Sequence, residues 1–196
     1  MTSDMQNLPE LPDTAELEEA VRRDRYYHRF RNMVTSTFLT LVVVAAVAVL
    51  VAVLFLPVLR IYGKSMRGTL DNGDIVVSVK SSNMKTGDVI AFYYNNNILV
   101  KRVIAGPGDW VDIDKDGNVF VNNEKLSEPY LDDKAYGETN IELPYQVPDG
   151  RIFVMGDNRS VSIDSRNTSI GCIAEEQIVG KIVYRVWPFT GLGVIH

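Results

Sequence analysis

The feature that most constrains this chain is a long segment without any charged side chain, residues 32–59. Its central part, residues 38–59, consists mostly of valine, alanine and leucine. An α-helix needs about 20 apolar residues to cross the roughly 30 Å hydrocarbon core of a bilayer. A buried helix of a soluble protein or a cleavable secretory signal is usually shorter. The segment therefore predicts a single transmembrane helix, which we place at residues 34–59.

Positive charge is distributed unevenly about this segment. Arg60, Lys64 and Arg67 follow it closely. A larger group of arginines precedes it: Arg22, Arg23, Arg25, Arg29 and Arg31. Because lysine and arginine concentrate on the cytoplasmic side of membrane spans, the bias predicts a cytoplasmic N-terminus. Residues 1–33 would then form a cytoplasmic tail, disordered to about residue 13, and a juxtamembrane helix. Residues 60–196 would form an extracytoplasmic domain, with the lipid bilayer as a partner.

Composition excludes several classes of function. The net charge of -5 gives no electrostatic support for binding nucleic acid. A single cysteine, Cys172, excludes an internal disulfide and a cysteine-based metal cage. Of the two histidines, His28 precedes the apolar segment and His196 ends the chain. A Ser-His-Asp triad is therefore not expected, and no metal or cofactor is implied.

Beyond residue 61 the hydrophobic pattern changes to short β-branched runs bounded by glycine, aspartate and asparagine. Residues 95–97 and 115–118 have the composition of hairpin turns. Residues 122–150 show little periodicity and predict an irregular excursion. The strands are expected at 74–80, 88–94, 98–104, 110–113, 119–121, 151–155 and 178–187. We therefore predict a mostly β fold: a single N-terminal transmembrane helix followed by an extracytoplasmic domain of short antiparallel strands, as a sandwich or partly open barrel.

Two residues in this domain indicate chemistry. Ser65 lies six residues beyond the apolar segment, so a fully extended link would keep it within about 20 Å of the outer membrane surface. A serine hydroxyl is a weak nucleophile unless a nearby base takes its proton. Lys101 is flanked by apolar residues of a predicted strand, and burial of that kind lowers the pKa of a lysine. The spacing alone does not decide between a buried base and an ordinary exposed strand lysine.

A third stretch, residues 156–166, crowds acids, arginines and serines beside an apolar strand. If these groups are buried, they must be paired and hydrogen-bonded to one another. The alternative is a solvated loop.

Together the three stretches resemble the type I signal peptidases, bacterial membrane-bound serine proteases with a Ser/Lys dyad, in their compact Gram-positive-like form. The first motif is Ser65-Met66-Arg67-Gly68-Thr69-Leu70, which departs from the family pattern at Gly68, where proline is usual. The second joins residues 101–103 to the turn at 106–109, and the third is residues 156–166. The resemblance covers roughly residues 61–187.

The resemblance implies a role for each matched position. Ser65 would be the nucleophile, Lys101 the general base, and Ser162 the residue that orients the lysine amine. The backbone N–H of Ser65 would hold the oxyanion. Gly63 stands where some relatives have a serine as second donor, so the source of that donor stays open. Two ion pairs would support the site: Asp164 with Arg166, and Asp157 with Arg102.

The resemblance also implies a substrate class: the signal peptides of exported preproteins, cut through an acyl-enzyme intermediate. The substrate would lie extended beside a strand. Shallow pockets lined by Ile61, Met66, Val76 and Val100 would admit only small side chains before the cut. Gly68 in place of proline would loosen the turn after the nucleophile.

Two alternatives belong to other classes. One is a catalytically silent relative that assists the assembly of surface proteins; such proteins typically lack the serine or the lysine, and this chain has both. The other is a self-cleaving repressor-type protease with a related β fold. That class is cytoplasmic and carries a DNA-binding region, whereas this chain has an apolar span.

Overall fold

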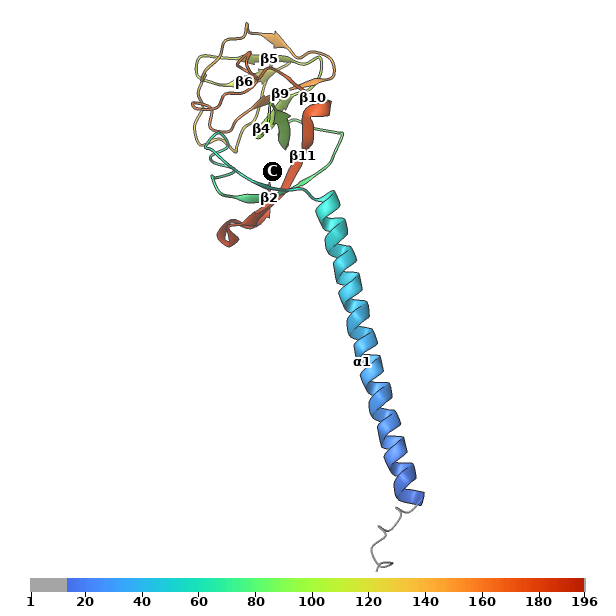
Figure 1. Ribbon diagram of the computed structural model, residues 1–196. Coiled ribbons are helices and arrows are strands. Elements are labelled where there is room, and N and C mark those ends of the chain that lie inside the picture. The colour runs from blue at the N-terminus through green and yellow to red at the C-terminus, as the bar shows by residue number, and fades with distance from the viewer. Residues whose placement is uncertain (1–13, 196) are drawn as a thin grey trace, which may run out of the picture. The chain divides into compact units, whose positions relative to one another are not determined.

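The computed structural model describes residues 14–195, apart from the side chains of residues 16, 17, 20 and 52–55. The chain divides into two compact units, residues 1–51 and 52–196 (Figure 1). The predicted disordered tail, residues 1–13, lies outside the described residues.

One helix, α1, dominates the first unit and spans Thr14–Phe55. Its stretch Val21–Val51 has a mean hydropathy of 2.6 in its most apolar part, and is long and apolar enough to cross a membrane. The predicted end of the span at residue 59 is too late. Pro57 cannot continue the helical hydrogen bonding, and Val58–Arg60 form the first strand, β1.

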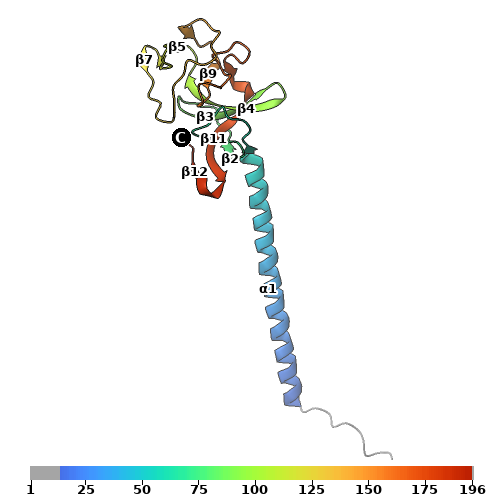
Figure 2. The same cartoon turned by 90° about the vertical axis from the view of Figure 1, so that its left-hand side faces the viewer.

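The second unit contains two open sheets of antiparallel strands, so the prediction of a mostly β domain is confirmed and no closed barrel forms. The larger sheet has the order β1-β2-β11-β3-β4-β9-β10, and β12 pairs with β11. Its remaining strands are β2 (Ile75–Val79), β3 (Val89–Tyr94), β4 (Asn97–Ala105), β9 (Arg151–Met155), β10 (Ile173–Ala174), β11 (Ile178–Trp187) and β12 (Gly193–Val194). Figure 2 labels β2, β3, β4, β9, β11 and β12 of this sheet.

The smaller sheet has the order β7-β6-β5-β8. Its strands are β5 (Trp110–Ile113), β6 (Val119–Val121), β7 (Glu124–Lys125) and β8 (Tyr145–Gln146). Two short 3-10 helices, η1 (Glu175–Gln177) and η2 (Phe189–Gly191), complete the described elements. All seven predicted strands are present, with bounds within two residues of those expected.

The hairpin turns follow from local backbone chemistry. Strands β3 and β4 pair up to Tyr94 and Asn97, so residues 95 and 96 make the turn. Asn95 has a φ of 51°, a left-handed conformation that asparagine tolerates better than most residues. Between β5 and β6, Gly117 has a φ of 78°, which glycine adopts without steric cost.

Strand β4 is the element that positions the site, because its two edges are paired over different lengths. It pairs with β3 from Asn97 to Arg102. On its other edge it pairs with β9 only from Arg102 to Ala105. The first half of β4 therefore has one edge free of strand pairing in this sheet.

Candidate active site

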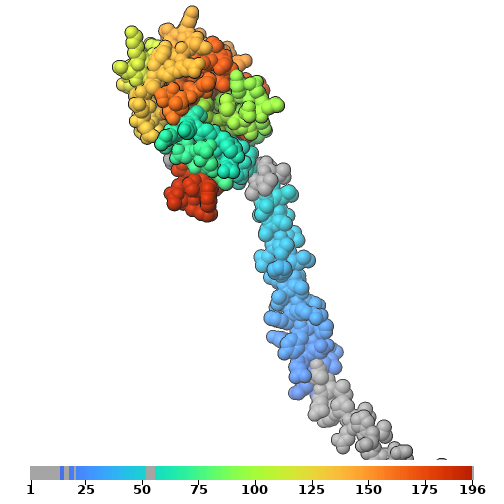
Figure 3. Space-filling view, turned by 60° about the vertical axis from the view of Figure 1, so that its left-hand side comes forward, coloured from blue at the N-terminus to red at the C-terminus, as the bar shows by residue number. Residues whose placement is uncertain are grey.

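A cleft of about 600 Å³ lies against this part of β4. One wall is formed by β1 and the segment that follows it, and the other by the β3–β4 hairpin; Figure 3 shows the corresponding teal and green regions side by side on one face. The lining residues are Leu59, Arg60, Ile61, Tyr62, Gly63, Ser65, Met66, Asn96, Asn97, Ile98, Leu99, Val100 and Lys101. The fold therefore brings Ser65 and Lys101, 36 positions apart in sequence, to one cleft.

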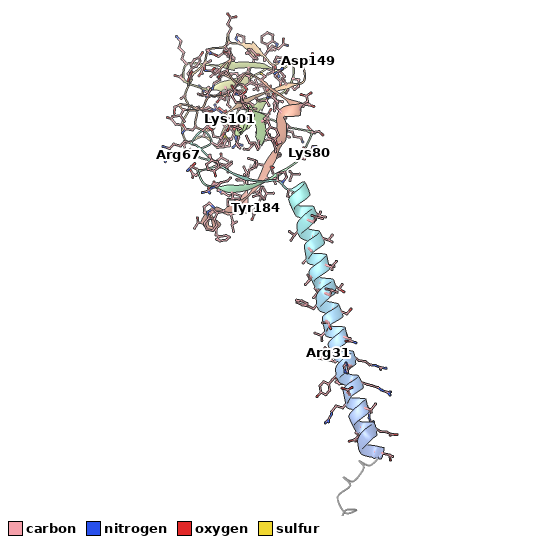
Figure 4. All side chains as sticks on the ribbon, in the orientation of Figure 1. Arg31, Arg67, Lys80, Lys101, Asp149 and Tyr184 are labelled. Atoms are coloured by element: carbon pink, nitrogen blue, oxygen red, sulfur yellow. The ribbon has the colours of Figure 1, made fainter. Side chains whose placement is uncertain are left out.

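Lys101 is buried within the β unit, with 4% of its surface exposed (Figure 4). Burial lowers the pKa of its amine to about 8; Asp164 acts in the opposite direction, and Arg166 reinforces the decrease. Within residues 14–195 its amine forms no ion pair. A substantial neutral fraction is therefore present at mildly alkaline pH, which a general base requires.

Ser65 is half-buried in a turn. Asn158, which the sequence analysis did not single out, holds the main chain of this turn. The Asn158 N–H donates to the carbonyl of Ser65 at 2.9 Å. Its side-chain Nδ2 donates to the carbonyl of Lys64 at 3.2 Å. Among the described residues, no group accepts a hydrogen bond from the backbone N–H of Ser65. That N–H is therefore free to bind a developing oxyanion.

The turn that carries Ser65 is anchored to the apolar core by its own buried side chains. Met66 and Leu70 are buried in a cluster with Ile61, Val76 and Ile182. The N–H of Leu70 donates to the carbonyl of Met66 at 2.8 Å, which closes the turn. Ser65 and Met66 both line the cleft, and Met66 is at the same time buried in this apolar cluster.

Gly156 brings the third sequence motif against this turn. A Cβ at position 156 would lie 2.2 Å from the Ser162 Oγ and 2.6 Å from the Ser65 carbonyl oxygen, so no side chain fits there. Ser162 is buried beside this glycine. Its hydroxyl also lies beside the Asp164 carboxylate, but it forms a hydrogen bond of standard geometry with neither Asp164 nor Lys101.

Arg102 and Asp157 form a buried bidentate ion pair. Arg102 Nε donates to Asp157 Oδ1 at 2.9 Å, and Nη2 donates to Oδ2 at 2.7 Å. Thr69 links this pair to the turn of Ser65: its hydroxyl donates to Asp157 Oδ2 at 2.6 Å and accepts from Arg102 Nη2 at 2.9 Å. Paired charge-assisted hydrogen bonds of this geometry are strong and directional.

Asp164 and Arg166 form a second buried pair, with Nε–Oδ1 and Nη2–Oδ2 distances of 2.8 and 2.9 Å. Burial opposes ionisation of Asp164, but the hydrogen bonds and charge of Arg166 outweigh it, so the pKa of Asp164 lies below its usual value. The Gly156 N–H also donates to Asp164 Oδ2 at 2.9 Å. The charged side chains of residues 156–166, which we call the site loop, are thus buried and paired rather than solvated.

The structure separates the predicted pocket residues into two groups. Ile61, Met66 and Val100 line the cleft. Val76 is completely buried in the apolar cluster beneath them and is not part of the lining.

Gly63 has a φ of 97°, and its N–H donates to Asn72 Oδ1 at 3.0 Å, so that N–H is not a free second oxyanion donor. Among residues 14–195, no three histidine, cysteine or acidic side chains come together as a metal site.

One cleft is thus lined by a serine and by a buried lysine that has no acidic partner among the described residues. This arrangement is that of a Ser/Lys hydrolase. Residues 34–187 match the family described as signal peptidase, peptidase S26. The chain is 40% identical over 150 residues to signal peptidase IB of Staphylococcus aureus (strain COL), which covers 66% of this chain and 77% of that protein. The chain therefore belongs to the signal peptidase family and is a serine peptidase of the type I class.

Two further comparisons extend the list of relatives. Thylakoidal processing peptidase 1, chloroplastic, of Arabidopsis thaliana is 36% identical over 165 residues, covering 74% of this chain and 47% of that protein. The crystal structure of a signal peptidase I from Enterococcus faecalis V583 superposes with a TM-score of 0.44 and 30% identity, covering 50% of this chain and 96% of that chain.

Proposed function

We propose that this chain removes signal peptides from exported preproteins at the outer face of a membrane, with Ser65 as nucleophile and Lys101 as general base. The observation that carries the proposal is the presence of both side chains in one cleft, with the lysine buried and without an ion-pair partner among the described residues. Family membership supports the substrate class, since relatives such as the Staphylococcus aureus protein are signal peptidases by name.

The chemistry needs two acyl transfers. The neutral amine of Lys101 takes the proton of Ser65 Oγ as the oxygen attacks the scissile carbonyl. The tetrahedral intermediate collapses when the lysine ammonium returns the proton to the leaving amine, which is the new N-terminus of the mature protein. Water, deprotonated by the same lysine, then hydrolyses the ester on Ser65 and frees the signal peptide.

The remaining residues of the motifs would act by positioning. The free N–H of Ser65 would hold the oxyanion, and Asn158 supports its orientation by fixing the main chain on both sides. Ser162, buried at the contact with Gly156, would orient the lysine amine once the substrate closes the cleft. The Arg102–Asp157 pair would hold β4 to the site loop, and the Asp164–Arg166 pair would fix the conformation of the loop itself.

The substrate would bind as an added strand. The unpaired edge of β4 and the segment after β1 form opposite walls of the cleft. An extended peptide between them would form main-chain hydrogen bonds with exposed edges, while alternate side chains enter pockets. Ile61, Met66 and Val100 leave apolar pockets suited to small residues such as alanine on the upstream side of the cut.

The location would follow from chain connectivity. Ser65 is ten residues beyond Phe55, the last residue of α1, so even an extended link places it within about 35 Å of the end of the helix. With a single span and the arginine-rich flank on the cytoplasmic side, this distance keeps the site near the outer membrane surface. The cut site of a preprotein held by its own apolar segment emerges in the same zone.

The test is cleavage of a preprotein, or of an extended peptide with Ala-x-Ala before the cut, in lipid vesicles. Ser65→Ala and Lys101→Ala should abolish cleavage, whereas exposed residues of the same types outside the cleft, Ser82→Ala and Lys115→Ala, should retain it. Circular dichroism checks that all four variants fold. An inactive but folded wild type would instead favour the silent, assembly-assisting relative.

A further inference from the structure

A segment of the irregular excursion between β7 and β8 contacts the buried ionic groups of the site. We call residues 128–137 the strap. Glu128 belongs to it and has a completely buried side chain, although an irregular loop would normally leave a glutamate in water. Its partner is Arg159 of the site loop, whose Nη2 donates to Glu128 Oε1. An ion pair between Glu128 and Arg159 thus joins the strap to the site loop.

The strap also contacts the other two buried arginines of the site. The Arg102 guanidinium lies 3.8 Å from the centroid of the Tyr130 ring, a cation–π contact. The Tyr130 hydroxyl donates to Glu128 Oε1 at 3.2 Å, which joins the two contacts. Arg166 Nη1 donates to the carbonyl of Tyr136 at 2.8 Å. Each of the three arginines therefore has at least one strap residue against it.

The strap is connected to the turn of Ser65 through residues of the site loop. Arg159 Nε donates to the carbonyl of Gly156 at 3.2 Å, and Arg166 Nη2 donates to the carbonyl of Arg159 at 3.0 Å. Gly156 is the residue that abuts both the Ser162 hydroxyl and the Ser65 carbonyl. Movement of Arg159 would therefore shift the point at which the site loop meets the turn of Ser65.

Charge balance gives a second reason for the strap. The site loop and β4 contribute three buried arginines but only two buried carboxylates, Asp157 and Asp164. Glu128 supplies the third carboxylate, so the cluster is neutral without Lys101. A buried cation that loses its partner is strongly unfavourable. Without Glu128, the charge of Arg159 would be relieved only by displacement of the loop.

We propose that Glu128 and Tyr130 are positioning residues for the cleavage reaction, acting through Arg159 and Arg102 on the site loop. The inference rests on the proposed function of Ser65 and Lys101. No strap residue lines the cleft, so substrate binding should not depend on the strap directly. A loss of positioning therefore lowers kcat and leaves KM nearly unchanged, whereas a fault in substrate binding would raise KM.

The experiment compares Tyr130→Leu, Tyr130→Phe and Glu128→Gln in vesicle-embedded full-length protein. Tyr130→Leu should lower kcat about tenfold or more, since a small misplacement of reacting groups has effects of this size. Tyr130→Phe keeps the ring over Arg102 and should recover most of that loss. The matched controls are Tyr184→Leu and Glu124→Gln, two exposed positions away from the site that should behave as wild type.

Amide hydrogen exchange of residues 156–166 gives a readout that is independent of cleavage. Tyr130→Leu and Glu128→Gln should speed exchange in this loop, and the two controls should not. Unchanged exchange, or a rise in KM with an unchanged kcat, overturns the proposal. If cleavage proves independent of Ser65, the proposed function fails, and so does the catalytic role of the strap, whatever the exchange result.

Discussion

Lys101 and Arg102 are adjacent in β4 and both are buried, yet only Arg102 has a carboxylate partner among the described residues. Strand alternation turns their side chains to opposite faces. Arg102 engages both oxygens of Asp157, whereas the lysine amine forms no ion pair with this acid. Burial therefore decides the direction of the Lys101 pKa shift, and that pKa is lowered.

The first prediction concerns pH. The pKa of Lys101 is lowered to about 8, and only the neutral amine accepts a proton. The neutral fraction increases as pH rises through the pKa, so kcat/KM should increase with pH, reach half its maximum near pH 8, and then level off. Initial-rate measurements on one peptide across neutral and alkaline pH check this. A flat profile would exclude Lys101 as the base.

The second prediction concerns Gly156. Gly156→Ala would place a methyl group 2.2 Å from the Ser162 Oγ and 2.6 Å from the Ser65 carbonyl oxygen. Because one of these groups must move, we expect kcat to fall about 100-fold. Gly193→Ala is the matched control, since nothing lies within 4 Å of its added methyl group. Equal activity of the two variants would show that the contact is not needed.

The third prediction concerns the buried pair of Arg102 and Asp157. Asp157→Asn leaves the Arg102 charge buried without a carboxylate, so the free energy of unfolding should fall by about 3–5 kcal/mol. Asp88→Asn is the comparison, because its partner Lys181 is partly exposed, and such pairs contribute about 0–1 kcal/mol. Denaturant unfolding of the two variants measures the difference. A similar small loss in both would contradict a structural role for Asp157.

The fourth prediction concerns Gly68, the departure from the family motif. Its φ is 104°, whereas proline fixes φ near about −65°. Gly68→Pro should therefore distort the turn, lower the melting temperature and reduce cleavage, instead of restoring a better site. Gly68→Ala should have a weaker effect of the same sign, since its methyl group lies 3.2 Å from Asp132 Oδ2. A more active proline variant would mean that the turn can adopt the other conformation.

The sequence was sufficient to predict the longer elements. The apolar helix is a long uncharged run, and strands such as β3 and β11 are runs of six or ten mostly β-branched and aromatic residues. The strands that were not predicted, β1, β7, β8, β10 and β12, have only two or three residues each. Strands this short have no readable pattern of their own, and β8, for example, is defined only by its pairing with β5, on the other side of the strap. The end of the helix was predicted too late because Val58 and Leu59 are apolar enough for a span but pair with β2.

The candidate site was only partly readable from the sequence. Ser65 and Lys101 stand in motifs, but burial of the lysine depends on packing around β4 that the sequence alone left open. Asn158 lies inside the third motif, and its asparagine between acidic and basic neighbours was the available signal. Glu128 and Tyr130 carried no signal, because their partners Arg159 and Arg102 lie about 30 residues away.

The half-paired β4 has a consequence for turnover. If the substrate adds a strand along this edge, the cut falls just beyond that strand, and the departing signal peptide keeps its main-chain hydrogen bonds. Product release would then be slow compared with acyl transfer. We expect the free signal peptide, ending in alanine, to inhibit competitively with an affinity close to that of the substrate. Inhibition constants measured with truncated signal peptides would show which step limits turnover. That step would be either release of the signal peptide from the β4 edge into the membrane or cleavage of the peptide bond.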